Sequence, residues 1–191
     1  MTPGETPPGP GPAGTARDGV LRTRLKGGLR LLALSALLLA GVGAVGRLVG
    51  WIALTTTLGP TAYLLLAHPH SVSARLRSAV IGHALAVVVG LACLALFGLW
   101  SHPSTAAEQH DTGAQIGAQA LSVGLTLFLL HVCEAHHPPA AATTLLITSG
   151  ISRPGPPLYG MLTGLVLILA IAPLMSVATT PKQPEQAEGD G

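Results

Sequence analysis

The sequence predicts an all-α membrane protein: a polytopic transmembrane helix bundle of five to six hydrophobic helices, some of them short and interrupted by proline. Two observations carry this prediction. Hydrophobic residues make up 49% of the 191-residue chain and charged residues 9%, whereas soluble domains carry about 25% charged residues. The charges also gather near the two ends, so that residues 31–181 hold only seven of them. So few charged side chains leave a water-facing surface uncovered.

The apolar runs define the expected helices. Residues 31–46, 48–67, 78–107, 112–133 and 154–181 carry no charge. A membrane-spanning helix needs about 20 apolar residues. The last four runs reach this length, and the first does so with Leu29 and the snorkelling side chains of Arg30 and Arg47. A further apolar piece, Pro138 to Ser149, is too short to cross alone, so the sequence leaves five and six crossings open.

The chain divides into three parts by composition. Residues 1–28 are rich in Pro and Gly, end in a basic run, and are expected to be a disordered tail. Residues 29–180 form the expected transmembrane domain. Residues 181–191 are an acidic tail, also expected to be disordered.

The basic residues predict the orientation. With a cytoplasmic N-terminus and five crossings, eight of the ten basic residues lie inside, and Arg47 and Lys182 lie outside. With six crossings, Arg153 also moves outside and the C-terminus returns to the cytoplasm. We therefore expect a multi-pass protein of the cell membrane (a bacterial inner membrane) with its N-terminus in the cytoplasm.

A faint internal repeat joins the two halves of the chain. Gly59-Pro60-Thr61-Ala62, followed by leucines, resembles Pro138-Pro139-Ala140-Ala141, followed by leucines. Each half would hold a long helix, a proline-interrupted short helix, a basic turn and a second long helix. Paired interruptions of this kind point to the binding site of a transporter, although apolar sequences also produce such matches by chance. Two Gly-x-x-x-Gly spacings, at Gly46 and Gly50 and at Gly160 and Gly164, predict close-packed seams within the bundle.

The second interruption carries a recognisable motif. The stretch His137-Pro138-Pro139-Ala140-Ala141-Ala142-Thr143-Thr144-Leu145-Leu146 resembles the signature of the HPP family of integral membrane proteins. Leu58 to Leu66 is similar to a second family segment, and Arg77, ahead of Gly82-His83, lies where the family has an arginine. Ala141 departs from the motif, which has glycine there. The resemblance covers about residues 30–178 and implies four to six membrane helices; some relatives are linked to nitrite transport.

The residues themselves favour an anion site at this motif. Pro138 and Pro139 end one helix and begin another at membrane depth. The new helix presents free N–H groups and the positive end of its dipole, which bind small anions. The expected substrate-binding residues are His137, Pro138, Pro139, Thr143, Thr144, Gly59, Pro60, Arg77 and His83. In the alternative interpretation the motif is a tight surface turn, Arg77 anchors a helix end, and His83 is a packing histidine.

A metal site is a second interpretation. Glu134 and His137 have the Glu-x-x-His spacing of carboxylate metal sites, and His131, Cys133 and His136 add donors. However, Pro138 interrupts the helix, and the chain has no second Glu-x-x-His.

The sequence contains no Walker A loop, dinucleotide fingerprint or Gly-x-Ser-x-Gly elbow, so we expect neither an enzyme nor a cofactor. Three functions stay open. They are a small-anion (nitrite-like) transporter or channel, a divalent-metal carrier or sensor, and a non-transporting structural or regulatory subunit. The expected partners are the lipid bilayer and a small inorganic anion. The net charge of +2 indicates no nucleic acid, and a homo-oligomer is left open.

Overall fold

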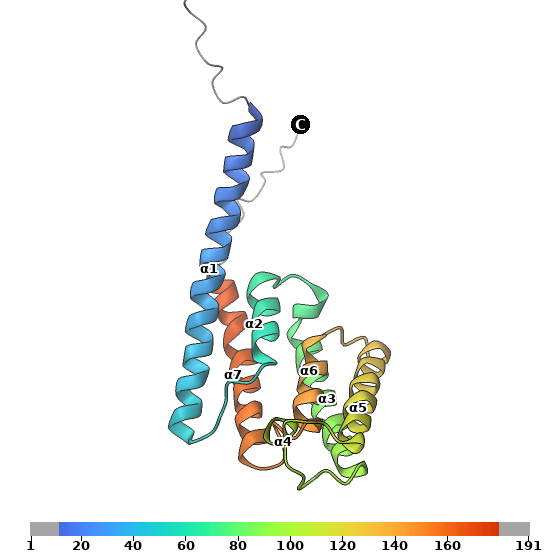
Figure 1. Cartoon of the computed structure of the whole chain (residues 1–191). Coiled ribbons are helices and arrows are strands. Elements are labelled where there is room, and N and C mark those ends of the chain that lie inside the picture. The colour runs from blue at the N-terminus through green and yellow to red at the C-terminus, as the bar shows by residue number, and fades with distance from the viewer. Residues whose placement is uncertain (1–11, 180–191) are drawn as a thin grey trace, which may run out of the picture.

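The computed structural model describes residues 12–179, with side chains from Arg17 to Ala178, and this part of the chain is helical without strands. The elements are α1 (Pro12–Val49), α2 (Leu58–Ala67), the 3-10 turn η1 (Val72–Ala74), α3 (Leu76–Leu96), α4 (Thr105–Glu108), α5 (Gly113–Val132), α6 (Pro139–Thr148) and α7 (Pro156–Thr179) (Figure 1). Four helices, α1, α3, α5 and α7, are long and apolar enough to cross a membrane, whereas α2 and α6 are shorter. The predicted all-α bundle is confirmed.

One end of the bundle, here called the basic end, holds the turn after α2 and the turn between α5 and α6. The ring of His137 bonds to the carbonyl of Ser73, which places these two turns side by side. Residues of α1 between Arg24 and Leu34 line a common groove with the C-terminal part of α2. The first turns of α1 extend beyond the bundle on this side, and α7 ends there (Figure 1).

The opposite end, here called the far end, gathers the connections that follow α1, α3 and α6. Trp51 stacks on Tyr159 with 5.6 Å between the ring centroids, and the N–H of Thr105 donates to the carbonyl of Ser149 at 3.0 Å. The segments containing α2 and α6 therefore each lead from one end to the other. Followed through the bundle, the chain runs between the two ends in the order that the six-crossing alternative expects, with Arg153 at the far end.

The order of elements repeats in the two halves. Each half has a long helix, a short helix, a turn and a second long helix: α1, α2, η1 and α3, then α5, α6, the turn at residues 149–155 and α7. The last helix of each half packs on the other half, because α3 contacts α5 and α6, and α7 contacts α1 and α2. This exchange ties the halves into one bundle.

The run 48–67 does not form a single spanning helix, contrary to the prediction. Gly50 ends α1 with a positive φ of 76°, a conformation that suits glycine. Residues 51–57 lie outside any helix, and α2 begins only at Leu58. Two local causes explain this. Ile52 and the three threonines before Leu58 are β-branched and favour extended backbone, and Pro60 fits only the first turn of a helix.

The predicted disordered tail is also corrected in its described part. Residues 12–28 form the first turns of α1. Pro12 suits the first helical position, and no further proline occurs until Pro60, so nothing interrupts the helix. Residues 1–11 and the predicted acidic tail at 181–191 lie outside the described residues.

Glycines make room for the helix-free segment 51–57. A Cβ on Gly160 would overlap the carbonyl of Ile52, and a Cβ on Gly164 would overlap the carbonyl of Ala53. A Cβ on Gly46 would come within 2.7 Å of the Trp51 carbonyl oxygen. The predicted close packing is thus present at Gly46, Gly160 and Gly164, where α1 and α7 hold this segment between them. It is absent at Gly50, which ends α1 and whose Cβ would meet nothing within 4 Å.

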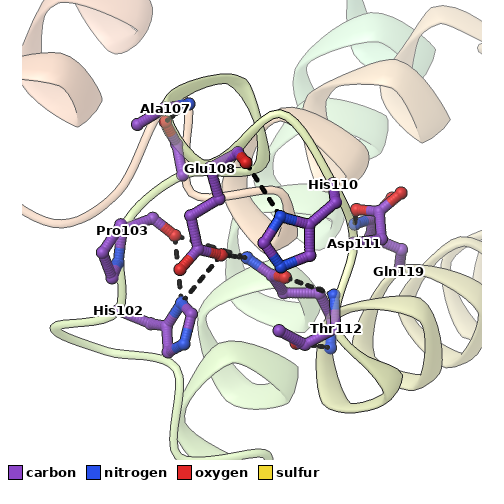
Figure 2. Close-up of polar contacts among 10 residues, drawn as sticks. His102, Pro103, Ala107, Glu108, His110, Asp111, Thr112 and Gln119 are labelled. Carbon is purple, nitrogen blue, oxygen red and sulfur yellow. Dashed lines mark hydrogen bonds and ion pairs between the residues drawn. The ribbon is translucent and has the colours of Figure 1, made fainter.

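Local polar contacts organise the far-end loop between α3 and α5 (Figure 2). Glu108 of α4 lies 3.7 Å from the Nδ1 atom of His102. Thr112 and Gln115 form a capping box at the start of α5, and Gln119 donates to Asp111 at 3.0 Å. Both carboxylates of the loop are therefore engaged, and the loop fixes how α3 leads into α5.

Candidate functional site

The first residues of the two short helices meet inside the bundle. Thr57 directly precedes α2, but its side chain does not cap that helix. It reaches α6 instead, where its Oγ1 lies 3.1 Å from the carbonyl oxygen of Pro139 and 2.9 Å from Oγ1 of Thr143. Two helix N-termini, each the positive end of a helix dipole, are thereby brought to one place.

Two buried histidines join this meeting point. The Nδ1 atom of His83 lies 2.8 Å from Oγ1 of Thr143, and its Nε2 atom lies 3.2 Å from Oγ1 of Thr61. The Nε2 atoms of His83 and His137 are 3.2 Å apart. On its other side, Nδ1 of His137 donates to the carbonyl of Ser73 at 2.7 Å. The two rings meet edge to face.

We call Thr57, Thr61, His83, His137 and Thr143 the His–Thr network. None of the five is more than 4% exposed, and they come from the turn before α2, from α2, α3 and α6, and from the turn before α6. The network contains no carboxylate and no permanent cation. The site is a buried cluster of hydroxyl and imidazole groups that bond to one another.

The local sequence explains how His137 reaches this position. Glu134, with a φ of 51°, turns the chain back after α5. Pro138 and Pro139 then start the next helix, where their missing N–H groups cost nothing. The predicted free N–H groups are not present at this helix start, because the N–H groups of Ala140 and Ala141 donate to the carbonyls of His137 and Pro138 at 3.0 and 3.1 Å. Gly82 of α3 completes the fit, because a Cβ there would stand 3.2 Å from the Cβ of His137. The pair Gly82-His83 thus offers His137 both space and a partner.

Thr144 belongs to a different set of contacts. Its hydroxyl lies 2.8 Å from that of Thr126 on α5 and donates to the carbonyl of Ala86 on α3 at 3.0 Å. Ser122 and Thr148 form a second hydroxyl pair along the same seam, at 3.3 Å. This seam joins α6 to α5 and α3 and lies beside the network.

The other predicted site residues are placed apart from the network. Pro139 is buried and contributes its carbonyl, whereas Pro138, Gly59 and Pro60 are exposed. Arg77 is exposed at the start of α3. The structure therefore brings together His137, Pro139, Thr143 and His83, and it separates Thr144, Pro138, Gly59, Pro60 and Arg77 from them.

A small cavity opens at the basic end next to the network. Its volume is about 150 Å³, and its polar lining comes from Arg75, Arg77, Ser78, Cys133 and Glu134. Ala135, two residues before His137, also lines it. Its lining has two arginines and one carboxylate, so the cavity carries a positive balance.

The proposed metal ligands are not gathered. Within residues 17–178, no three side chains of His, Cys, Asp or Glu come together in the manner of a metal site. His131, Cys133, Glu134 and His136 are exposed. The helical Glu-x-x-His face does not form, because α5 ends at Val132.

Two members of the network, Thr57 and Thr61, were not expected. A signal for them exists in the sequence: Thr55, Thr56 and Thr57 interrupt an apolar run directly before Gly59-Pro60, and Thr61 follows Thr57 at helical spacing. The Ser73 carbonyl, in contrast, leaves no trace in the sequence, because every residue has a carbonyl.

This fold and site define a class: a polytopic helical membrane protein in which two short helices meet head to head at a buried polar network. The family model described as HPP, transmembrane region, matches residues 21–184. The chain belongs to this family, as its His-Pro-Pro motif indicated. Comparisons with curated proteins and with solved structures found no match.

Proposed function

We propose that this protein is a small-anion transporter or channel of the cell membrane, with nitrite as the first anion to test. The observation that carries the proposal is the meeting of two helix N-termini at the His–Thr network. The positive dipole ends of helices and the hydroxyl and imidazole donors of the network favour negative charge. The network has no carboxylate, so it holds no negative charge that would balance a bound cation.

The surroundings favour the same sign of charge. Arg75 and Arg77 line the cavity at the basic end, and Ala135 of its lining is two residues from His137. Positive side chains around a cleft raise the local concentration of anions. We propose that an anion enters the network from this cavity.

The basic residues also support an orientation. Among described residues, the basic end carries Arg17, Arg22, Arg24, Lys26, Arg30, Arg75 and Arg77, and the far end carries Arg47 and Arg153. Cytoplasmic segments of membrane proteins are enriched in Lys and Arg. We therefore place the basic end and the cavity in the cytoplasm. The lipid bilayer and the anion are the proposed partners, without a catalysed reaction or a cofactor.

The structure corresponds to a closed form in this proposal. Thr57 and Thr143 bond directly to each other, and Thr143 also bonds to His83. An anion must exchange these bonds for bonds to itself. The contact between α2 and α6 would then be both the binding site and the barrier to flow.

The test is nitrite flux into proteoliposomes, compared for the wild type and two variants. Thr143→Val removes a hydroxyl that faces the anion path, and Thr163→Val is the matched control, because the Thr163 hydroxyl bonds only within α7, to the Tyr159 carbonyl. We expect Thr143→Val to lose about tenfold or more in flux, since a hydrogen bond to a charged group contributes about 1.5–3 kcal/mol. Thr163→Val should match the wild type.

Full flux in correctly inserted Thr143→Val would contradict this site. A panel of nitrite, nitrate, chloride and divalent metal ions separates the remaining functions. Movement of metal ions alone would support a metal carrier, and movement of nothing would support a structural or regulatory subunit.

A further inference from the structure

The hydrogen positions around the two histidines follow from their fixed acceptors. A carbonyl only accepts, so His137 carries a proton on Nδ1, which donates to Ser73, and neutral His137 has a bare Nε2. Thr61 gives its one hydroxyl proton to the carbonyl of Thr57, 2.9 Å away. Nε2 of His83 must therefore be the donor toward Oγ1 of Thr61 and Nε2 of His137.

On the Nδ1 side of His83, the hydroxyl groups of Thr143 and Thr57 can reverse the direction in which they donate. In the neutral network, Thr143 donates to Nδ1 of His83, and Thr57 donates to Thr143 although the Pro139 carbonyl is also within reach, at 3.1 Å. Adding a proton to Nδ1 turns this order round. His83 then donates to Thr143, Thr143 to Thr57, and Thr57 to the Pro139 carbonyl. The network thus accepts one positive charge while each of its donors keeps an acceptor, as buried groups require.

A second proton has no comparable place. It would have to bind Nε2 of His137, which faces the Nε2–H group of His83 at 3.2 Å. Two N–H groups and two like charges would then point at each other, and a like charge at this distance disfavours protonation. The geometry of the pair allows one proton.

We propose that the His83–His137 pair is a proton-binding site whose single proton moves together with the transported anion. This inference rests on the proposed function. An anion in the network is an unpaired charge in a low-dielectric interior, which is costly. A proton taken from water onto His83 cancels that charge, and the anion in turn favours the protonated imidazole. The two ions then bind cooperatively, and the loaded network is electrically neutral.

The other titratable and charged side chains of the elements packed around the pair lie away from it. α2 and α6 present threonines to it, and η1 presents a backbone carbonyl. The ionisable side chains of the packed elements are exposed or distant: Tyr63 on α2, Arg75 after η1, Arg77 on α3, His131 on α5, Cys133, Glu134 and His136 in the turn, Tyr159 on α7 at the far end, and Cys93 about three turns further along α3. The charge of the pair itself therefore responds most directly to an anion in the network.

The experiment measures nitrite and protons in the same proteoliposomes, with a pH-sensitive dye inside and the membrane potential clamped. Protein-free vesicles give the passive permeation of nitrous acid, which is subtracted. We expect one proton to enter with each nitrite ion. The nitrite flux should not respond to the clamped potential. It should rise about tenfold for each unit by which the external pH falls, until the pair is saturated with protons.

Two substitutions of the same kind locate the effect. His83→Gln keeps a hydrogen-bonding side chain that cannot take the proton, so we expect it to lose both proton entry and the dependence of flux on pH. His131→Gln makes the same change at an exposed histidine of α5 and should keep both. Nitrite flux that carries net charge, or a pH dependence that persists in His83→Gln, would overturn the proton site and leave the proposed function standing.

If the wild type moves no anion, the proposed function fails, and nitrogen NMR of the imidazoles in lipid bilayers decides the proton site by itself. The spectrum should show Nδ1–H on His137 and Nε2–H on His83 at neutral pH, with the pair taking up one proton on acidification. A neutral His83 with its proton on Nδ1, or a pair that takes up two protons, would overturn the inference.

Discussion

At the scale of single residues, two neighbouring threonines of α6 bond to different parts of the molecule. Thr143 bonds to His83 and Thr57, whereas Thr144 bonds to Thr126 and the Ala86 carbonyl. Successive residues of a helix point about 100° apart, so one helix can border the network with one side chain and hold α5 with the next. The sequence offers no means of telling the two apart.

We predict that Thr144→Val lowers stability and spares transport. Valine keeps the shape of threonine but leaves the Ala86 carbonyl and the Thr126 hydroxyl without this partner. Hydrogen bonds between membrane helices contribute about 0.6 kcal/mol each, at most about 1.7, so we expect a loss of roughly 1 kcal/mol. The measurements are reversible unfolding in detergent and nitrite flux. A variant with wild-type stability and no flux would instead place Thr144 at the anion site.

The candidate site could be predicted in part. His83, His137 and Thr143 are conspicuous because polar side chains within apolar runs usually face the interior of a membrane bundle. In the other half, Gly59 and Pro60 were the predicted site residues, but they are exposed. Thr57 and Thr61 contact Thr143 and His83 instead. Which face of α2 turns inward depends on how it packs on its neighbours, and the sequence of a uniformly apolar helix does not record that.

At the scale of elements, the prolines predicted where the short helices lie, whereas the helix-free segment 51–57 was not predicted. Pro138 and Pro139 set the start of α6 because they tolerate only the first turn of a helix. Residues 51–57 belong to an apolar run that satisfies the length rule for a span, yet they form no helix and lie against α1 and α7. Only the glycines that face this segment make that path available.

We predict that Gly164→Ala destabilises the protein although the residue lies inside a helix. Exchanging glycine for alanine in an exposed helix normally gains about 1 kcal/mol. At Gly164 the new Cβ would overlap the Ala53 carbonyl and displace the segment that leads to Thr57. We expect a lower melting temperature and a lower nitrite flux together.

Gly124→Ala on α5 is the control for this prediction, because its Cβ would meet nothing within 4 Å. It should equal the wild type or exceed it in stability. A gain in stability in both variants would show that the helix-free segment yields easily, and that its close contact with α7 does not hold Thr57 in place.

At the scale of the whole molecule, the two half-length helices decide the topology. In segment 51–67 a helix-free stretch and α2 together connect the ends, and α6 with the following turn does the same in the second half (Figure 1). The N-terminal end of α1 and the C-terminal end of α7 therefore both lie at the basic end. Hydropathy alone left five and six crossings open because a helix of ten residues, such as α6, is too short to span the hydrocarbon region.

The last prediction tests this path by labelling cysteines from outside intact cells with a membrane-impermeant maleimide. Cys133 is exposed at the basic end, so Cys133→Ser supplies the background. Ser73→Cys reports the basic end, since the Ser73 contact to His137 uses a backbone carbonyl and survives the change. Ala107→Cys in α4 and Ile151→Cys after α6 report the far end, where both residues are exposed.

We expect the cysteines at positions 107 and 151 to react from outside, and the cysteine at position 73 only after the cells are permeabilised. The reason is the excess of Lys and Arg at the basic end, which holds that side in the cytoplasm. The reporter at position 151 separates the two topologies, because five crossings place it with position 73 and six place it with position 107. Equal access to positions 73 and 107 would contradict both. The result also fixes the side from which an anion reaches the arginine-lined cavity, since that cavity opens at the basic end.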